Sequence, residues 1–177
     1  MKLKGKHIAF LVEDGFEDLE FWVTFMRLRE EGARVTVVGS RLERFHGKHC
    51  LTATPDVEVA DVCPEDFDGL VVPGGWAPDK LRRYPAILEL VRGVYNQGKI
   101  VAAICHAGSV LISAGIVKGH KATSSTGIRD DLVNAGAEWV DEPAFRDGNL
   151  VWGRVVEDIP DFCRELVNAL AETEGQS

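Results

Sequence analysis

The sequence predicts a single α/β domain with a mostly parallel central sheet, because short apolar segments alternate with helical patterns along the chain. Runs of almost wholly apolar residues are typical of strands that are buried on both faces of a parallel sheet. The predicted strands are residues 7–12, 35–38, 69–72 and 100–104. Helices placed between such strands predict βαβ units with right-handed crossovers.

The predicted helices are marked by apolar side chains at helical spacing and by glycines that follow them. In the first helix, the side chains that recur on one side are Leu19, Trp22, Val23, Met26 and Leu28. Further helices are predicted at 87–97, from just after Cys105 to Gly115, and at 159–170. The last of them is expected to close the domain.

Two segments depart from this alternation. Residues 45–60 are predicted to form a β-hairpin or an extension at the edge of the sheet, and residues 137–153 a second hairpin with its turn at 147–149. The sequence contains no repeat, low-complexity segment or linker. Residues 1–177 are therefore expected to form one domain that is frayed only at 172–177.

The charge balance argues against two classes of partner. The 177 residues include 28 acidic and 20 basic side chains, a net charge of −8, whereas nucleic acids and anionic membranes bind clusters of Lys and Arg. No segment approaches the roughly 20 continuous apolar residues that span a bilayer. We therefore expect neither a nucleic acid as the main partner nor a membrane.

The cysteines indicate a reducing compartment. They are Cys50, Cys63, Cys105 and Cys163, without CxxC pairing or regular spacing, which suits free thiols in a cytosol. His46 and His49 lie near Cys50, but no other set of ligands has the spacing of a metal site. We expect a cytoplasmic protein with no metal site and no cofactor.

The chemistry is expected at one edge of the sheet, because ligands bind beyond the carboxyl ends of parallel strands. Three of the predicted strands are followed there by segments that are polar or rich in glycine. These segments are the acidic residues 13–18, the Pro-Gly-Gly sequence at 73–75 and the Cys-His-Ala-Gly sequence at 105–108. The sequence therefore predicts carboxylates, a glycine pair and a Cys-His pair on the same edge.

Cys105 lies where a predicted strand meets a predicted helix. This is the strand–turn–helix arrangement of a nucleophile elbow, although the glycines of the G-x-S-x-G motif are missing. The positive end of the helix dipole is expected to lower the pKa of this thiol and so to favour the reactive thiolate. The common alternative is a small thiol buried in the core.

Glu17 opens the first predicted helix at the same edge. It is a candidate either to hydrogen-bond the Cys105 thiolate as a protonated carboxyl or to transfer a proton to and from a substrate carbonyl. The alternative is a first-turn carboxylate that only complements the helix dipole. Glu13, Asp18 and Glu20 fit that alternative better.

Two further candidates are less specific. Gly74 and Gly75 follow a strand and are suited to present backbone N–H groups to an oxyanion, but a tight turn explains the pair equally well. His106 directly follows Cys105, and adjacent residues in a turn rarely point at each other. It is expected to need a carboxylate from elsewhere or to act through its backbone N–H.

Several blocks of the sequence resemble the PfpI-type intracellular protease family, which belongs with the Parkinson-disease deglycase and the class I glutamine amidotransferases to a larger group. The blocks are Phe-Glu-Asp at 16–18, Gly-Lys-His at 47–49, Val-Pro-Gly-Gly at 72–75, Ala-Ile-Cys-His at 103–106 and Leu-Ile-Ser-Ala-Gly at 111–115. The similarity continues through 123–141 and covers the chain from about residue 6 to residue 170, in order and with similar spacing.

The resemblance implies a flavodoxin-like three-layer sandwich with Cys105 on a strained nucleophile elbow. It implies that Glu17 hydrogen-bonds the thiol and that Gly75 and the backbone of His106 form an oxyanion hole. It also implies a homo-oligomer, a dimer or a hexamer, in which an acid from a neighbouring subunit completes His106. The matching position is Asp79, where the family usually has the longer Glu.

Two departures from the family pattern concern the substrate pocket. The family often reads Cys-His-Gly-Pro where this chain has Cys-His-Ala-Gly at 105–108, and Ser125 replaces a tyrosine that often lines the pocket. Both departures leave the nucleophile in place and bear on the choice of substrate.

The resemblance supports three hypotheses about function. In the leading one, Cys105 attacks a small reactive dicarbonyl, or its adduct with a protein or nucleotide amine. Glu17 then moves a proton so that a hydroxy acid is released, as in a stress-protective glyoxalase or deglycase. In the second, the chain is an intracellular cysteine peptidase, a hydrolase with a Cys-His-acid triad completed across a subunit interface. In the third, it is a redox or stress sensor that works through oxidation of Cys105.

Overall fold

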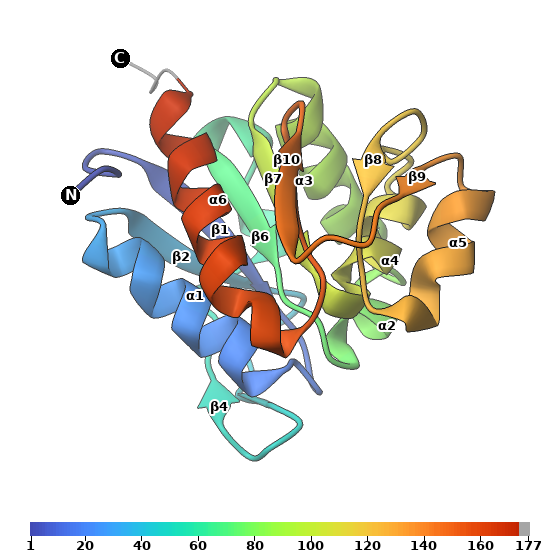
Figure 1. The fold of residues 1–177 in the computed structure, drawn as a ribbon. Coiled ribbons are helices and arrows are strands. Elements are labelled where there is room, and N and C mark those ends of the chain that lie inside the picture. Colours follow the sequence, from blue (N-terminus) through green and yellow to red (C-terminus); the bar gives the residue numbers. More distant parts are fainter. Residues whose placement is uncertain (174–177) are drawn as a thin grey trace.

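A seven-stranded sheet forms the middle layer of the computed structural model, which describes residues 1–173 (Figure 1). Its strand order is β10-β11-β7-β6-β1-β2-β5. The strands are β1 (His7–Val12), β2 (Arg34–Gly39), β5 (Val57–Glu58), β6 (Gly69–Val72), β7 (Ile100–Ile104), β10 (Ala144–Asp147) and β11 (Leu150–Gly153). All neighbouring strands run parallel except β10, which is antiparallel to β11. The predicted mostly parallel sheet is confirmed.

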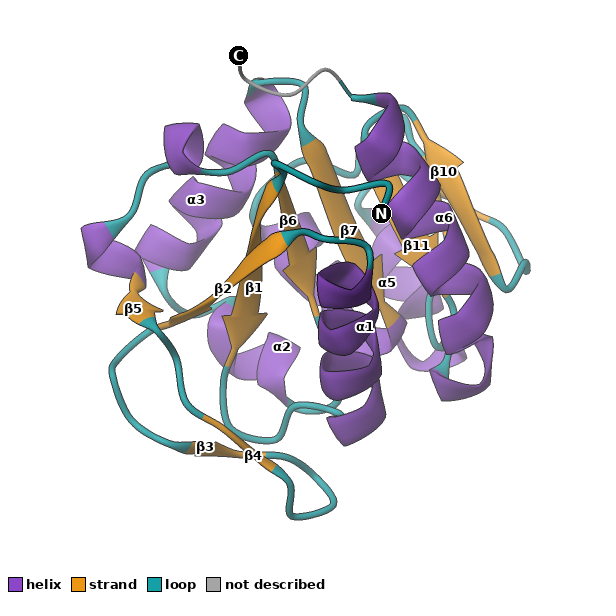
Figure 2. Cartoon of the chain, turned by 90° about the vertical axis from the view of Figure 1, so that its left-hand side faces the viewer, coloured by secondary structure: helices purple, strands orange, loops and turns teal. Residues whose placement is uncertain are grey.

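Helices cover both faces of this sheet (Figures 1 and 2). On one face α1 (Asp18–Glu30) and α6 (Ile159–Glu172) pack against each other. The helices of the other face are α2 (Ala77–Leu81), α3 (Pro85–Asn96), α4 (Gly108–Ser113) and α5 (Arg129–Asn134). The four helices expected from the sequence are present, whereas the short α2 and α5 were not expected because neither is long enough to show a helical period. The result is the predicted three-layer sandwich.

The apolar strands supply the core. Residues Ile8 to Val12 of β1 and Ile100 to Ile104 of β7 are buried throughout, as expected for strands covered by helices on both faces. Phe10 of β1 packs edge-on against Phe21 of α1, with ring centroids 4.7 Å apart, and both side chains are fully buried. Burying one such side chain contributes roughly 1.5–3 kcal/mol to stability.

The apolar side chains of α1 do not all face the core. Leu19, Val23 and Met26 are 48%, 42% and 61% exposed, although they belong to the recurring apolar set. The buried positions of the helix are Asp18, Glu20, Phe21, Thr24 and Leu28. The apolar pattern is misleading here because three polar residues occupy buried positions.

The two irregular segments extend the fold at its margins. β3 (Phe45–His46) and β4 (Thr52–Ala53) form a small antiparallel pair, and β5 adds a parallel edge strand to β2. The second predicted hairpin is β10–β11, with Gly148 at φ +60° in its turn. Within 137–153, β9 (Glu138–Trp139) instead pairs in parallel with β8 (Lys121–Ala122).

The remaining short elements are single turns. The 3₁₀ helices are Val59–Asp61, Pro64–Asp66, Cys105–Ala107, Thr126–Ile128 and Val156–Asp158. At the carboxyl end Glu172 still belongs to α6, so the predicted fraying does not begin there, and 174–177 lie outside the described residues. Among the described helices, none combines the length and the apolar character needed to cross a membrane.

Candidate active site

The three predicted segments meet at one edge of the sheet. Strands β7, β6 and β1 are neighbours and run parallel, so the residues that follow their carboxyl ends lie together. An isolated antiparallel bridge joins Phe16, after β1, to Gly75, after β6. The three segments therefore lie together at one edge of the sheet, as the sequence predicts.

Cys105 occupies a strained backbone position. It follows β7, begins a 3₁₀ turn that continues into α4, and has φ +61°, which is rare for a residue other than glycine. Such a conformation costs on the order of 1–3 kcal/mol and persists only where the surrounding structure enforces it. Gly74 lies beside it, where a Cβ atom would stand 2.9 Å from Cys105 Cβ and would overlap the Glu20 carboxylate. The strained elbow expected from the resemblance is present.

The carboxyl group beside the thiol is that of Glu20. Its side chain is fully buried, and Oε1 accepts a hydrogen bond from the Gly74 N–H at 2.9 Å. Oε2 is buried and has no partner of good hydrogen-bond geometry among the described residues, yet Glu20 and Cys105 interact closely enough to shift each other's pKa. Burial, followed by the charge of Glu17, raises the pKa of Glu20 to about 8, so this carboxyl keeps its proton at neutral pH.

Glu17 has a different role in the structure. It is the N-cap residue of α1, in extended conformation, and its Oε2 accepts a hydrogen bond from the Glu20 N–H at 2.8 Å. Its Oε1 lies 3.8 Å from Nε2 of His49. The expectation that Glu17 hydrogen-bonds the thiol is not met, because its carboxylate turns back to cap the helix. Glu20, which was assigned to the helix dipole, points to the thiol instead.

The pKa of the Cys105 thiol is raised, not lowered. Burial and then the negative charge of Glu20 raise it to about 12, and they outweigh a hydrogen bond from the His106 backbone N–H that favours the thiolate. The predicted effect of the helix dipole is small because α4 begins only at Gly108 and spans a single turn and a half. Cys105 and Glu20 therefore titrate as a coupled pair, in which the carboxyl loses its proton before the thiol does.

His106 points toward the thiol, contrary to the expectation for adjacent residues. Its Nδ1 lies 3.4 Å from Sγ of Cys105, and its Nε2 faces Gly127, where a Cβ atom would approach to 3.0 Å. Burial lowers the pKa of this imidazole, and the nearby charge of Lys48 lowers it further. His106 is therefore a neutral imidazole at pH 7, able to accept or donate one proton at the thiol.

The Gly75 N–H, a candidate oxyanion donor, is not used by the bridge that joins Gly75 to Phe16. The bridge bonds run from Glu17 N–H to Gly74 O and from Trp76 N–H to Gly15 O, which makes Phe16 and Gly75 a non-hydrogen-bonded pair. The Gly75 N–H consequently points away from Phe16. Gly75 also has φ +80°, a conformation that glycine adopts without strain.

Asp79 does not pair with His106 within the chain. It lies on α2, and its exposed carboxylate forms an ion pair with Arg83 one helical turn further on. A role for Asp79 toward a neighbouring subunit stays a prediction.

A cavity of about 500 Å³ opens beside the elbow. Its walls include Lys48, Gly75, Trp76, Asp79, Arg82 and His106. A larger hollow of about 670 Å³ lies at the amino ends of β1 and β2, beside His7 and Thr36, at the opposite end of the sheet from the thiol. Because Gly75 and His106 line it, the cavity at the elbow is next to the candidate nucleophile.

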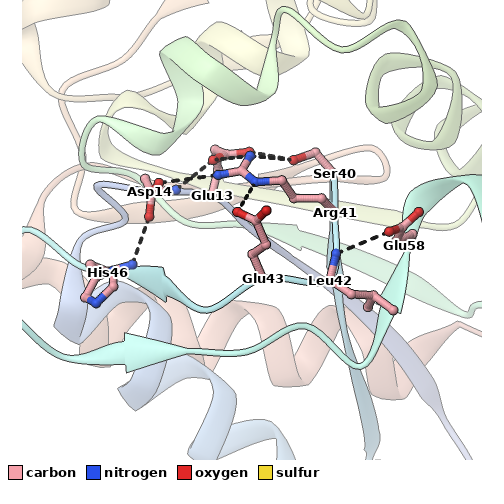
Figure 3. A network of polar contacts seen from close by, with 8 residues as sticks. All are labelled: Glu13, Asp14, Ser40, Arg41, Leu42, Glu43, His46 and Glu58. Carbon is pink, nitrogen blue, oxygen red and sulfur yellow. Dashed lines mark hydrogen bonds and ion pairs between the residues drawn. The ribbon is translucent and has the colours of Figure 1, made fainter.

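The other acidic residues at this edge fix the loops around the cavity. Figure 3 shows Glu13 accepting a hydrogen bond from Ser40 Oγ at 2.7 Å and contacting Arg41, while Asp14 accepts one from the His46 N–H at 3.0 Å. Asp18 accepts hydrogen bonds from the N–H groups of His49 and Leu51. Within residues 1–173, no group of three His, Cys, Asp or Glu side chains is arranged to hold a metal ion.

Comparison with known proteins gives consistent matches along the chain. The model of the DJ-1/PfpI family matches residues 6–169. An uncharacterized protein of Archaeoglobus fulgidus is 46% identical over 92% of this chain and 97% of its own length. Deglycase PfpI of Pyrococcus furiosus is 42% identical over 92% of this chain and 98% of its own length.

Solved structures show the same fold. Drosophila melanogaster DJ-1beta superposes with a TM-score of 0.89 at 29% identity, over 97% of this chain and 93% of that one. A two-domain protein of Anabaena variabilis, with DJ-1/ThiJ/PfpI-like and ferritin-like domains, superposes with a TM-score of 0.91 at 38% identity over 93% of this chain. The present chain spans about half the length of that protein, 48%.

Proposed function

The chain belongs to the DJ-1/PfpI family, and we propose that it is a cysteine-dependent glyoxalase or deglycase that acts on reactive dicarbonyls or their amine adducts. The observation that carries the proposal is the pairing of Cys105, on a strained elbow, with the buried carboxyl of Glu20. The names of relatives such as deglycase PfpI support the same class of activity.

The reaction proceeds by covalent catalysis. With methylglyoxal, His106 takes the thiol proton and Sγ of Cys105 adds to the aldehyde carbon, while Glu20 gives its own proton to the aldehyde oxygen; the products are a hemithioacetal and an ionised Glu20. The Glu20 carboxylate then removes the proton from that carbon and returns it to the neighbouring carbonyl carbon, while the hydroxyl proton passes to the oxygen of that carbonyl, which yields a lactoyl thioester. Water cleaves the thioester, His106 returns the proton to the thiol, and the lactic acid released gives a proton to Glu20 and leaves as lactate.

The surrounding groups have matching roles. A carboxyl whose pKa is raised to about 8 is suited both to accept and to donate a proton near neutral pH, as this isomerisation requires of Glu20. The N–H groups of Gly75 and His106 are the donors available for the oxygen on which negative charge develops.

The test is lactate formation from methylglyoxal in the absence of glutathione. Cys105→Ala and Glu20→Gln are expected to lower turnover by at least about 100-fold, since each removes a group that forms or breaks a bond. Glu17→Gln is the matched control, because its amide oxygen can still cap α1, and it is expected to keep most of the activity. Loss of activity in Glu17→Gln, with Glu20→Gln active, would return the role to Glu17. A wild type without turnover would overturn the proposal.

One contact favours a second candidate, an intracellular cysteine peptidase. The 3.4 Å distance between Cys105 Sγ and His106 Nδ1 is that of a Cys-His pair. This activity needs an acid at His106, for which Asp79 of another subunit is the candidate. The test is cleavage of a casein substrate. Cleavage by the wild type that is lost in Asp79→Asn would favour the peptidase activity over the glyoxalase reaction.

A further inference from the structure

We propose that the cavity beside Cys105 binds an anionic group of the substrate, a carboxylate or a phosphate carried by the carbonyl compound, through Lys48 and Arg82. The inference rests on the proposed function for the reaction itself, but its evidence and its test concern binding. It assigns a negative charge to the substrate. The choice between glyoxalase and deglycase does not specify this charge.

Lys48 is a cation without a carboxylate partner. Its side chain lines the cavity, and Nζ lies 5.2 Å from the centre of the Trp76 ring. Lys48 appears in none of the ion pairs among the described residues. Its charge reaches the site, because it acts to lower the pKa of Cys105, Glu20 and His106.

The loop that carries Lys48 is fixed by hydrogen bonds of its backbone, which are partly buried. The Lys48 N–H donates to Phe16 O at 2.9 Å, and the Asp18 carboxylate holds the His49 and Leu51 N–H groups at 2.9 and 2.8 Å. Gly47 has no room for a side chain, because a Cβ atom there would overlap the Asp18 carboxylate. These contacts hold the cation at the mouth of the site and limit the entropy lost when an anion binds.

Arg82 supplies the second cation. It is half-buried in the wall of the cavity, its Nε donates to Ser113 Oγ at 2.9 Å, and it forms no ion pair within residues 1–173. The bond to Ser113 orients the guanidinium group and leaves its two terminal nitrogens for a ligand. A guanidinium held in this way is suited to bind a carboxylate or a phosphate with two hydrogen bonds.

The acid in the cavity wall does not cancel these charges. It is Asp79, and its carboxylate is already paired with Arg83. Lys48 and Arg82 are therefore two cations in the cavity wall that form no ion pair among the described residues, in a chain whose net charge is −8.

The test uses two alkylating reagents of nearly the same shape, iodoacetate and iodoacetamide, which differ in charge. Their rates at Cys105 are read near neutral pH by mass spectrometry of the peptide that contains it. Both reagents attack the same thiolate, so its abundance cancels from the ratio of the two rates. The ratio therefore reports the affinity of the cavity for an anion and needs no turnover.

Lys48→Met and Arg82→Met are expected to lower the ratio of iodoacetate to iodoacetamide rates by about three- to tenfold each, as expected for the loss of one nearby charge. Lys48→Arg is expected to retain the wild-type ratio. Lys80→Met, which removes a charge from the same helix α2 outside the cavity, is the matched control and is expected to leave the ratio unchanged. The midpoints of thermal unfolding of all variants show whether each is folded.

The source of the anion is distinguished by competition at constant ionic strength. If inorganic phosphate slows alkylation of the wild type more than acetate does, the substrate carries a phosphate. If acetate slows it more, the substrate carries a carboxylate. An unchanged ratio in both Lys48→Met and Arg82→Met, or an equal fall in Lys80→Met, overturns the inference. A wild type that shows the ratio effect but forms no lactate keeps the anion site and refutes only the proposed reaction.

Discussion

At the scale of single residues, the site depends on a carboxyl and a thiol that share one buried environment. Glu20 is fully buried and its pKa is raised to about 8, while the thiol of Cys105 becomes harder to ionise once Glu20 is charged. A fold keeps such an arrangement at a cost in stability, because burying a charged carboxylate is unfavourable. This cost in stability depends on pH, because it arises only when Glu20 loses its proton.

Glu20 is expected to make the folded protein less stable as the pH rises. The unfolded chain releases this proton near the ordinary value of 4.5, whereas the folded chain holds it up to about pH 8. Between these values the folded state binds more protons, so stability present below pH 4.5 is lost progressively as the pH approaches 8. Glu20→Gln removes this loss and is expected to gain about 2–4 kcal/mol over the wild type at pH 8, relative to their difference at pH 4.

Urea unfolding of both proteins across this pH range measures the effect. The fall in stability is expected in the wild type and absent from Glu20→Gln. The control Glu17→Gln keeps Glu20 and an oxygen that can cap α1, so it is expected to retain most of the fall. Parallel stability curves for the wild type and Glu20→Gln would show that the pKa of Glu20 is not raised.

The sequence could locate Cys105 and Gly75 but could not choose between Glu17 and Glu20. Both glutamates lie at the start of α1, and their roles depend on which residue begins the helix. Because α1 begins at Asp18, Glu17 becomes the cap and Glu20 turns inward. Helix boundaries predicted from sequence are uncertain by more than this one residue.

At the scale of elements, α1 shows why apolar spacing alone does not identify a core face. Leu28 is fully buried, whereas Met26 is 61% exposed, although the sequence places both in one recurring set. Three of the five buried positions are polar. They include Glu20, which the site needs, and Thr24, whose Oγ1 lies 3.7 Å from the sulfur of Cys163 on α6. Where a helix carries part of a site, its buried face is less apolar than a core helix requires.

Shortening a side chain to alanine is expected to cost more stability on the buried face of α1 than on its exposed face. Leu28→Ala is expected to destabilise the protein by about 2–5 kcal/mol, because it leaves a cavity in the core. Met26→Ala is expected to cost less than about 0.5 kcal/mol, since most of that side chain is already in contact with solvent. Urea denaturation at one fixed protein concentration measures both values. Equal costs would contradict the orientation of the helix.

At the scale of the whole molecule, the sequence predicted the polarity of the sheet but not its strand order. Parallel strands follow from the apolar runs and the helices between them, and with them the edge at which ligands bind. The placement of β6 between β1 and β7 depends on which helices cross which face, and short apolar strands carry too little information to specify it. That placement brings the Glu20, Gly75 and Cys105 segments together.

The polarity of the sheet places the candidate active site and the larger hollow at opposite ends of the strands. This hollow lies at the amino ends of β1 and β2, where His7 Nε2 is 2.8 Å from Thr36 Oγ1 and the His7 ring is 4.7 Å from that of Phe67. None of the residues that line this hollow belongs to the candidate active site, so we expect changes in the hollow to affect stability and not turnover. His7→Ala is expected to cost about 1–2 kcal/mol through the lost hydrogen bond and ring contact.

Measured turnover of methylglyoxal by His7→Ala should stay within about twofold of the wild type at a temperature where both are folded, since nothing at the carboxyl ends of the strands has changed. Unfolding curves recorded on the same samples supply the stability cost. A large fall in turnover without a matching fall in stability would mean that the two ends of the sheet are coupled. In that case the division of the molecule into a supporting end and a reactive end would be wrong.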